Sequence, residues 1–206
     1  MFAVIFEVQP RQGRFDDYLE LAKFLKPELE KIDGFIANER FASKRTEGRI
    51  LSLSIWRDEK AVIRWRTLGV HHEVQEKGRF EIFADYHLRV GEITADTDGP
   101  ELQQLRFDET EIGHAKAVTI SEASASQDLA AELGLPTAGV VDQEVFESIY
   151  APGKRLLLVS WTDREAAAQW RPKTPPTGTL RHRSVRIIRD YGKADRREAP
   201  QYYPPA

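Results

Sequence analysis

The sequence predicts an α+β protein made of two copies of one β-α-β-β-α-β unit, because a long segment of the chain is repeated. Residues 38–66 align without a gap with residues 143–171, and 11 of the 29 aligned positions are identical. The 105-residue spacing corresponds to one small domain rather than to a short solenoid repeat. Alternating and helical spacings of apolar residues then give the type of each element.

The first copy begins with a predicted strand and a predicted helix. The aromatic and valine side chains of residues 2–8 recur at every second position, which is typical of a strand. From Arg14 to Ile32 the apolar spacing changes to threes and fours, as along an amphipathic helix. Gly34 then stands where a helix commonly ends.

The rest of the first copy contains two strands, a helical region and a last strand. Strands are predicted over 35–43 and 49–56, with a turn at Gly48 between them. Asp58 is a predicted N-cap, and the helical region continues from it to Gly78. A strand over 80–90 completes a ferredoxin-like unit.

The second copy repeats this order between residues 115 and 190, with its first helix predicted over 126–133. Its second helix is followed by PKTPPTGT, where prolines prevent a longer helix. We therefore expect an intact unit, a linker, a degenerate unit and an extended tail, at 1–93, 94–113, 114–192 and 193–206. Each unit leaves one sheet face bare, so the two sheets are expected to pack on each other as an α+β barrel within one chain.

Composition excludes several classes of function. The 206 residues carry a net charge of −3, which gives no basic surface for nucleic acid. The chain has no cysteine, so disulfides and thiolate chemistry are excluded. No run approaches the roughly 20 apolar residues of a membrane span. The start, MFAVIFEVQP, is interpreted as a strand and not a signal peptide, and a cytoplasmic location is expected. A homodimer formed through the tyrosine-rich tail remains open.

The first unit resembles the antibiotic biosynthesis monooxygenase (ABM) domain of the dimeric α+β barrel superfamily. The residues that carry the resemblance are VIFEV at 4–8, IDGF at 32–35, ERF at 39–41, LSLS at 51–54, WRDE at 56–59, AV at 61–62, WR at 65–66, His71, Gln75, GR at 78–79 and FADY at 83–86. The resemblance implies a barrel that is usually made by two chains and is fused here. The family includes cofactor-independent monooxygenases of polyketide quinones, quinol oxidases and haem-degrading oxygenases.

Haem is an alternative that the resemblance leaves open. The haem-degrading branch has an asparagine on its first strand, a tryptophan on its second helix and a histidine ten residues later. Trp65 matches the tryptophan, but position 75 is Gln75 and residues 2–8 contain no asparagine. His71 or His72 would have to serve as the axial ligand. We expect no cofactor, and no metal site, because the five histidines lack HxH or HxxxH spacing.

The candidate site belongs to the first copy, near Trp65 and Gln75 and not beside Trp170. His71 is the candidate base, since an imidazole with a pKa near 6.5 suits proton transfer; the alternative is that it lines a pocket or caps a carbonyl. Likewise, Trp65 either stacks on a ligand or packs in the core. The expected ligand contacts are Trp65, His72, Gln75, Arg79, Tyr86, Asn38 and Arg40.

The resemblance and these residues together predict a cofactor-independent monooxygenase. Its expected substrate is a planar phenolic or quinone-type small molecule, held in an apolar cavity that excludes water. Two alternatives remain. The first is a small-ligand-binding or stress-response protein without turnover, and the second is a haem-binding or haem-degrading oxygenase.

Overall fold

Eight antiparallel strands close into a barrel in a computed structural model that describes residues 1–124, 128–175 and 178–201. The first unit contributes β1 (Phe2–Pro10), β2 (Phe35–Ser43), β3 (Ile50–Trp56) and β4 (Phe83–Asp96). The second contributes β5 (Ala117–Ser124), β6 (Val140–Ser148), β7 (Lys154–Trp161) and β8 (Leu180–Gly192). The predicted fold class is confirmed. The two sheets are also joined by hydrogen bonds, in the order β1-β3-β2-β6-β7-β5-β8-β4.

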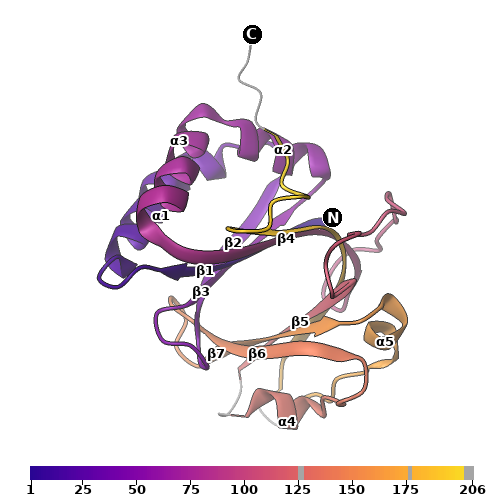
Figure 1. Ribbon diagram of the computed structural model, residues 1–206. Helices are drawn as coiled ribbons and strands as arrows, with labels where there is room; N and C mark the ends of the chain where they lie inside the picture. The colour runs from indigo at the N-terminus through magenta and orange to yellow at the C-terminus, as the bar shows by residue number, and fades with distance from the viewer. Residues whose placement is uncertain (125–127, 176–177, 202–206) are drawn as a thin grey trace.

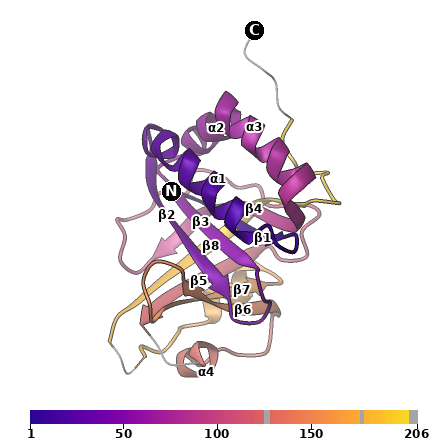
Figure 2. The same ribbon diagram turned by 90° about the vertical axis from the view of Figure 1, so that its left-hand side faces the viewer.

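Helices cover the barrel wall on two opposite sides (Figures 1 and 2). Over the first unit lie α1 (Phe15–Glu30), α2 (Glu59–Thr67), α3 (Gly69–Lys77) and a π-helical turn, η1 (Gly78–Ile82). Among the described residues of the second unit, the helices are α4 (Leu129–Leu133) and α5 (Arg164–Gln169). The first two positions of the helix predicted over 126–133 lie outside the described residues. The larger helical cover therefore belongs to the first unit.

The predicted N-cap at Asp58 is confirmed, and Asp163 forms the equivalent cap in the second copy. Asp58 accepts a hydrogen bond from the amide of Ala61 at 2.8 Å, and Asp163 accepts one from the amide of Ala166 at 2.7 Å. Each cap satisfies an amide that the first turn of a helix leaves without a partner. The repeat thus preserves the local signal that starts the second helix of each unit.

Apolar side chains from both units fill the barrel interior, because alternate residues of each strand point inward. The same face carries a buried ion pair of Glu7 with Arg89, which also donates to Ser160 at 2.7 Å, whereas the buried Glu92–Arg186 pair lies on the outer face. Burial of a charge requires such a partner. The apolar members are Ala3, Ile5, Phe41, Leu51, Leu53, Ile55, Ile93, Val118, Ile120, Phe146, Leu156, Leu158, Val185 and Ile187.

The junction between β2 and β6 shows an approximate two-fold symmetry. The hydroxyl of Ser148 donates to Glu39 at 2.7 Å, and the hydroxyl of Ser43 donates to Glu144. Glu39 and Ser43 are the positions that the repeat aligns with Glu144 and Ser148. Each unit therefore offers the same pair of groups to the other, as in an isologous dimer interface.

Three boundaries differ from the sequence-based expectation. The helical region after Asp58 breaks at Leu68, whose ψ of 125° is extended, and β4 begins at Phe83 because η1 precedes it. At the far end β4 continues through residues 94–96, which were expected to begin the linker. Asp96 pairs across to Arg183 and Arg181 on β8, so a polar stretch is held in a strand by partners from the other unit.

The tail was expected to be extended, and its described part is not. The amide of Ala199 donates to the carbonyl of Arg196 at 2.9 Å, which closes a turn. The carboxylate of Glu198 accepts hydrogen bonds from Thr110 at 2.8 Å and from the amide of Asp190 at 2.7 Å. These contacts turn residues 193–201 towards the helices of the first unit, as the yellow trace in Figure 1 shows. Residues 202–206 of the expected tail lie outside the described residues.

Candidate functional site

A cavity of about 750 Å³ lies between the helices of the first unit and the outer face of its strands. Strand β8 of the second unit and the tail also contribute residues to its lining. The structure brings together at this cavity all eight residues named from the sequence as site candidates: Asn38, Arg40, Trp65, His71, His72, Gln75, Arg79 and Tyr86.

The floor of the cavity is formed by outward-facing residues of the strands. Val4 and Phe6 of β1 and Leu88 of β4 make it apolar, whereas β2 and β3 contribute a polar stripe. Within that stripe the amide of Asn38 donates to the hydroxyl of Ser52 at 3.1 Å. Asn38 and Ser52 thus satisfy each other, whereas the buried Nε of Arg40 has no hydrogen-bond partner among the described residues.

His71 is held in one orientation by Trp65. The imidazole stacks on the indole, with ring centroids 3.9 Å apart and an interplanar angle of 17°, and its Nδ1 lies 2.8 Å from the carbonyl oxygen of Trp65. At the break that ends α2, the same carbonyl also accepts a hydrogen bond from the amide of Leu68 at 3.3 Å. In the neutral ring, Nδ1–H is the donor to this carbonyl, so Nε2 keeps a lone pair.

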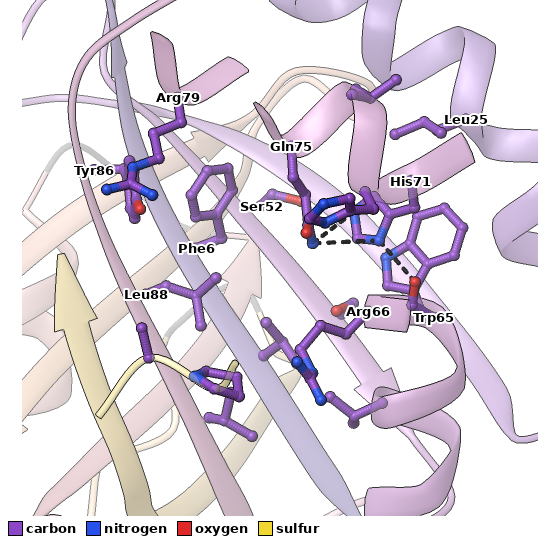
Figure 3. Close-up of a pocket in the computed structure, with 18 of the residues that line it drawn as sticks. Phe6, Leu25, Ser52, Trp65, Arg66, His71, Gln75, Arg79, Tyr86 and Leu88 are labelled. Atoms are coloured by element: carbon purple, nitrogen blue, oxygen red, sulfur yellow. Dashed lines mark hydrogen bonds between the residues drawn. The ribbon is translucent and has the colours of Figure 1, made fainter. Parts of the chain in front are cut away.

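Burial lowers the pKa of His71 to about 4. The side chain is therefore neutral near pH 7, and in the cavity as it stands it is a weaker base than a free imidazole. The amide nitrogen of Gln75, one turn further along α3, lies 3.3 Å from Nε2 (Figure 3). The two side chains form a donor–acceptor pair that a ligand oxygen could join or replace.

Positive charge dominates the polar part of the lining. Five arginines reach the cavity: Arg40, Arg66, Arg79, Arg189 and Arg196. The two carboxylates of the lining are Glu59, which is paired with Arg106, and Glu76. A cavity with this balance favours an anionic ligand.

Sequence analysis missed the residues that the second unit and the tail contribute, Arg189, Tyr191 and Arg196. The register of β4 with β8 places Tyr191 beside Leu88 and Arg189 beside Val90, on the same outer face. The two-residue spacing of Arg189 and Tyr191 is a signal for a shared strand face, but the sequence does not say which cavity that face meets.

Comparison with known proteins identifies the family. Residues 1–77 match the family model "Antibiotic biosynthesis monooxygenase" (ABM). The chain is 44% identical over 221 residues to a protein of Pyricularia oryzae named jasmonate monooxygenase ABM, and the alignment covers 100% of both chains. The chain is a member of the ABM family.

One solved structure supports the fold of this ABM protein. An aldoxime dehydratase in complex with butyraldoxime has a TM-score of 0.57 and 11% identity, covering 94% of this chain and 80% of the other. At this identity the likeness concerns the fold alone. A crystal structure named antibiotic biosynthesis monooxygenase covers 44% of this chain and 95% of its own, with 16% identity and a TM-score of 0.40.

The second unit of the ABM protein packs its tryptophan where the first unit opens a cavity. Trp170 is 5% exposed, with its ring 5.6 Å from that of Trp161 and 5.3 Å from that of His182. A second cavity, of about 310 Å³, lies beside α5 and is lined by Ala117, Arg164, Ala167, Ser184 and Arg186 among others. Trp65 and Trp170 thus occupy equivalent positions with different surroundings.

The described residues contain neither a metal-binding cluster nor a membrane-spanning helix. In residues 1–124, 128–175 and 178–201, no three side chains of the His, Cys, Asp or Glu type gather as a metal ion would require. Within the same ranges no helix is long and apolar enough to cross a bilayer.

Proposed function

We propose that this ABM-family protein is a monooxygenase acting on a jasmonate-type molecule, an apolar ring compound that carries a ketone and a carboxylate. The observation that carries the proposal is the cavity of the first unit, which combines an apolar floor with an excess of arginine. Its volume of about 750 Å³ lies within the range of about 300–1,000 Å³ of small-molecule sites. The printed name of the 44% identical relative supports the jasmonate class.

This substrate class replaces the planar phenolic or quinone-type molecule that the sequence predicts. Both classes are apolar rings that carry oxygen, so both suit the floor formed by Val4, Phe6 and Leu88. The carboxylate of jasmonate also suits the positive lining, which a neutral quinone does not use. A hydroxyquinone therefore belongs in the assay as the competing substrate.

His71 and Gln75 are the proposed reactive and orienting groups. The lone pair of His71 Nε2 would accept a hydrogen bond or a proton from the substrate, and the amide of Gln75 would donate to a substrate oxygen. The pKa of His71, about 4 with the cavity empty, would rise beside a substrate anion, because opposite charges favour the protonated ring. Trp65 would keep Nε2 pointed at the substrate through its carbonyl and its ring.

We propose that the reaction needs no bound cofactor. Without an added reductant the electrons must come from the substrate, and the balanced reaction is CH₂ + O₂ → C=O + H₂O. Hydroxylation, by contrast, requires an external donor of two electrons: RH + O₂ + 2e⁻ + 2H⁺ → ROH + H₂O. The mass of the product, formed under ¹⁸O₂ with and without an added reductant, distinguishes the two balances.

Haem fits this cavity less well. An axial histidine would bind iron through Nε2, and in His71 that atom faces the amide nitrogen of Gln75 at 3.3 Å. No step is therefore derived through haem. A haem titration followed by absorbance tests this directly, and a Soret shift that is lost in His71→Ala would favour the haem alternative.

The first prediction concerns turnover. His71→Ala should lower kcat/KM for jasmonic acid by about 10² or more, as expected for loss of a proton-transfer group. The working form is the neutral ring. Protonation of His71 should therefore not lower kcat/KM between pH 7 and 5, and kcat/KM should fall only as the pH drops through about 4. Oxygen consumption and product formation are the measurements.

His114→Ala is the matched control, since His114 is exposed and lies outside the cavity lining. It should retain the wild-type rate, and melting temperatures should show that both variants are folded. An unchanged rate in His71→Ala would remove this residue from the mechanism. Binding of jasmonic acid without oxygen consumption would instead support the ligand-binding alternative.

A further inference from the structure

We propose that Arg66, Arg189 and Arg196 form a carboxylate-binding subsite, through which the second unit and the tail anchor the acidic end of the substrate. The proposal deepens the proposed function and rests on it only in taking the ligand to be an apolar acid. The three arginines come from α2, β8 and the tail, and all three line the cavity.

The three arginines and Tyr191 all line the cavity where β8 and the tail border it. Arg196 lies 5.7 Å from the centre of the Tyr191 ring and donates a hydrogen bond to the hydroxyl of Tyr86. Arg66 donates to the backbone carbonyl of Gln201 at 2.9 Å, which holds α2 against the tail. Arg189 stands two residues before Tyr191 on the same outer face of β8, because its partner on β4 is Val90.

Tyr191 stays protonated in this cluster. Burial raises the pKa of its hydroxyl to about 12, although Arg196, Arg66 and Arg189 all act to lower it. All three arginines line the same cavity as Tyr191, so their charges face the same space. A neutral tyrosine and three cations offer only donors to an incoming anion.

None of the three arginines forms an ion pair with a carboxylate among the described residues. The acids nearby are engaged elsewhere. Asp190 lies 2.6 Å from His87 Nε2, and Glu198 accepts from Thr110 and from backbone amides. Converging, half-buried cations repel one another when no anion is present. A bound carboxylate would relieve this repulsion and accept charge-assisted hydrogen bonds from the guanidinium forks.

The subsite is separate from the proposed reactive pair. Figure 3 shows Arg66 on the side of the cavity near Leu88, with His71 and Gln75 on the neighbouring wall. A substrate bound by its carboxylate at the arginines would lay its apolar body on Phe6 and Leu88. The arginines would then act on binding and orientation, and their loss should raise KM more than it lowers kcat.

The test compares acids with neutral analogues on the full chain. Isothermal titration calorimetry with jasmonic acid, methyl jasmonate, decanoate and decanol gives four affinities for each variant. Arg189→Gln should weaken both acids about tenfold or more, as for loss of a charge-assisted contact, and should leave both neutral ligands unchanged. Arg189→Lys should recover part of the acid affinity, and Arg196→Gln should resemble Arg189→Gln.

Arg197→Gln is the matched control, because Arg197 adjoins Arg196 but is exposed and pairs with Asp195. It should bind all four ligands as the wild type does. The subsite is overturned if the wild type binds acids and neutral ligands with equal affinity. It is also overturned if Arg189→Gln and Arg189→Lys weaken the binding of acids and of neutral ligands equally.

The outcomes also separate the subsite from the proposed function. Arginine-dependent binding of decanoate without oxidation of jasmonic acid would support the subsite and contradict the proposed function. Oxidation of jasmonic acid with unchanged KM in Arg189→Gln and Arg196→Gln would support the proposed function and contradict the subsite.

Discussion

Two histidines, one in each unit, are held neutral by burial. His71 stacks on Trp65 at the cavity, while His182 meets the edge of the Trp170 ring and shares a hydrogen bond of 2.8 Å with Ser121. The pKa of each is lowered to about 4, chiefly by burial. A similar shift thus accompanies a cavity wall in one unit and a packed core in the other, so the shift alone does not mark a site.

The buried His182 should make the fold sensitive to mild acid. Its pKa is about 4 when folded and about 6.5 when unfolded, so between these values the unfolded chain binds the extra proton. The free energy of unfolding should therefore fall as the pH drops from 6.5 to 4, by at most about 2–3 kcal/mol from this group. Urea unfolding of the wild type and of His182→Asn, at several pH values, measures it. A slope as steep in the variant as in the wild type would contradict the assignment.

Residues that depend on local spacing were predictable, and those that depend on strand register were not. Asp58, Trp65 and His71 follow from helical signals within one segment. Arg189 and Arg196 reach the same cavity only because β8 pairs with β4 and the tail turns back. A single sequence carries no information on that pairing beyond the alternation of each strand.

Among the elements, the helical region after Asp58 and the tail shape the cavity most. The spacing of residues 58–78 predicts continuous helix, yet the chain breaks at Leu68, and His71 then packs back on Trp65 six positions earlier. Tertiary packing overrides helix propensity here. The tail is also placed by tertiary contacts, because the carboxylate of Glu198 accepts hydrogen bonds from Thr110 and from the amide of Asp190.

Glu198 should control how firmly the tail lies on the cavity. Its carboxylate accepts from Thr110, from the amides of Glu111 and Ile112, and from the amide of Asp190. Glu198→Ala should release residues 193–201, with a loss of about 1–3 kcal/mol of local stability. Trypsin should then cut at Arg196 and Arg197 roughly tenfold faster or more.

The control for this experiment is Glu111→Ala, which keeps the amide that Glu198 binds. It should be cut at the wild-type rate. If trypsin cuts Glu198→Ala no faster than the wild type, other contacts, such as that of Arg66 with Gln201, suffice to hold the tail.

At the scale of the molecule, the two units form one closed barrel with a shared interior. Hydrogen bonds cross at the β2–β6 and β4–β8 junctions, and the Arg89–Ser160 hydrogen bond crosses between units inside. Neither unit could bury this interior alone. The asymmetry lies outside the barrel, where one unit has a cavity and the other a packed tryptophan.

The chain should therefore unfold in a single transition. Tryptophan fluorescence and far-ultraviolet circular dichroism should give coincident urea curves, since opening either unit exposes the common core. The double variant Ser43→Ala/Ser148→Ala removes the donors to Glu144 and Glu39, and should lower the free energy of unfolding by about 2–4 kcal/mol without splitting the transition. Two separated transitions, in the wild type or the variant, would show that the units fold independently.

The reciprocal Ser–Glu pairs at the β2–β6 junction have a consequence for how the protein behaves on dilution. In a barrel made by two chains, the interface forms only above the dissociation constant, and every substitution occurs on both sides of the axis. A single chain removes both constraints. The wall that β8 adds to the cavity stays in place at any protein concentration, and a change at Trp170 need not be matched at Trp65.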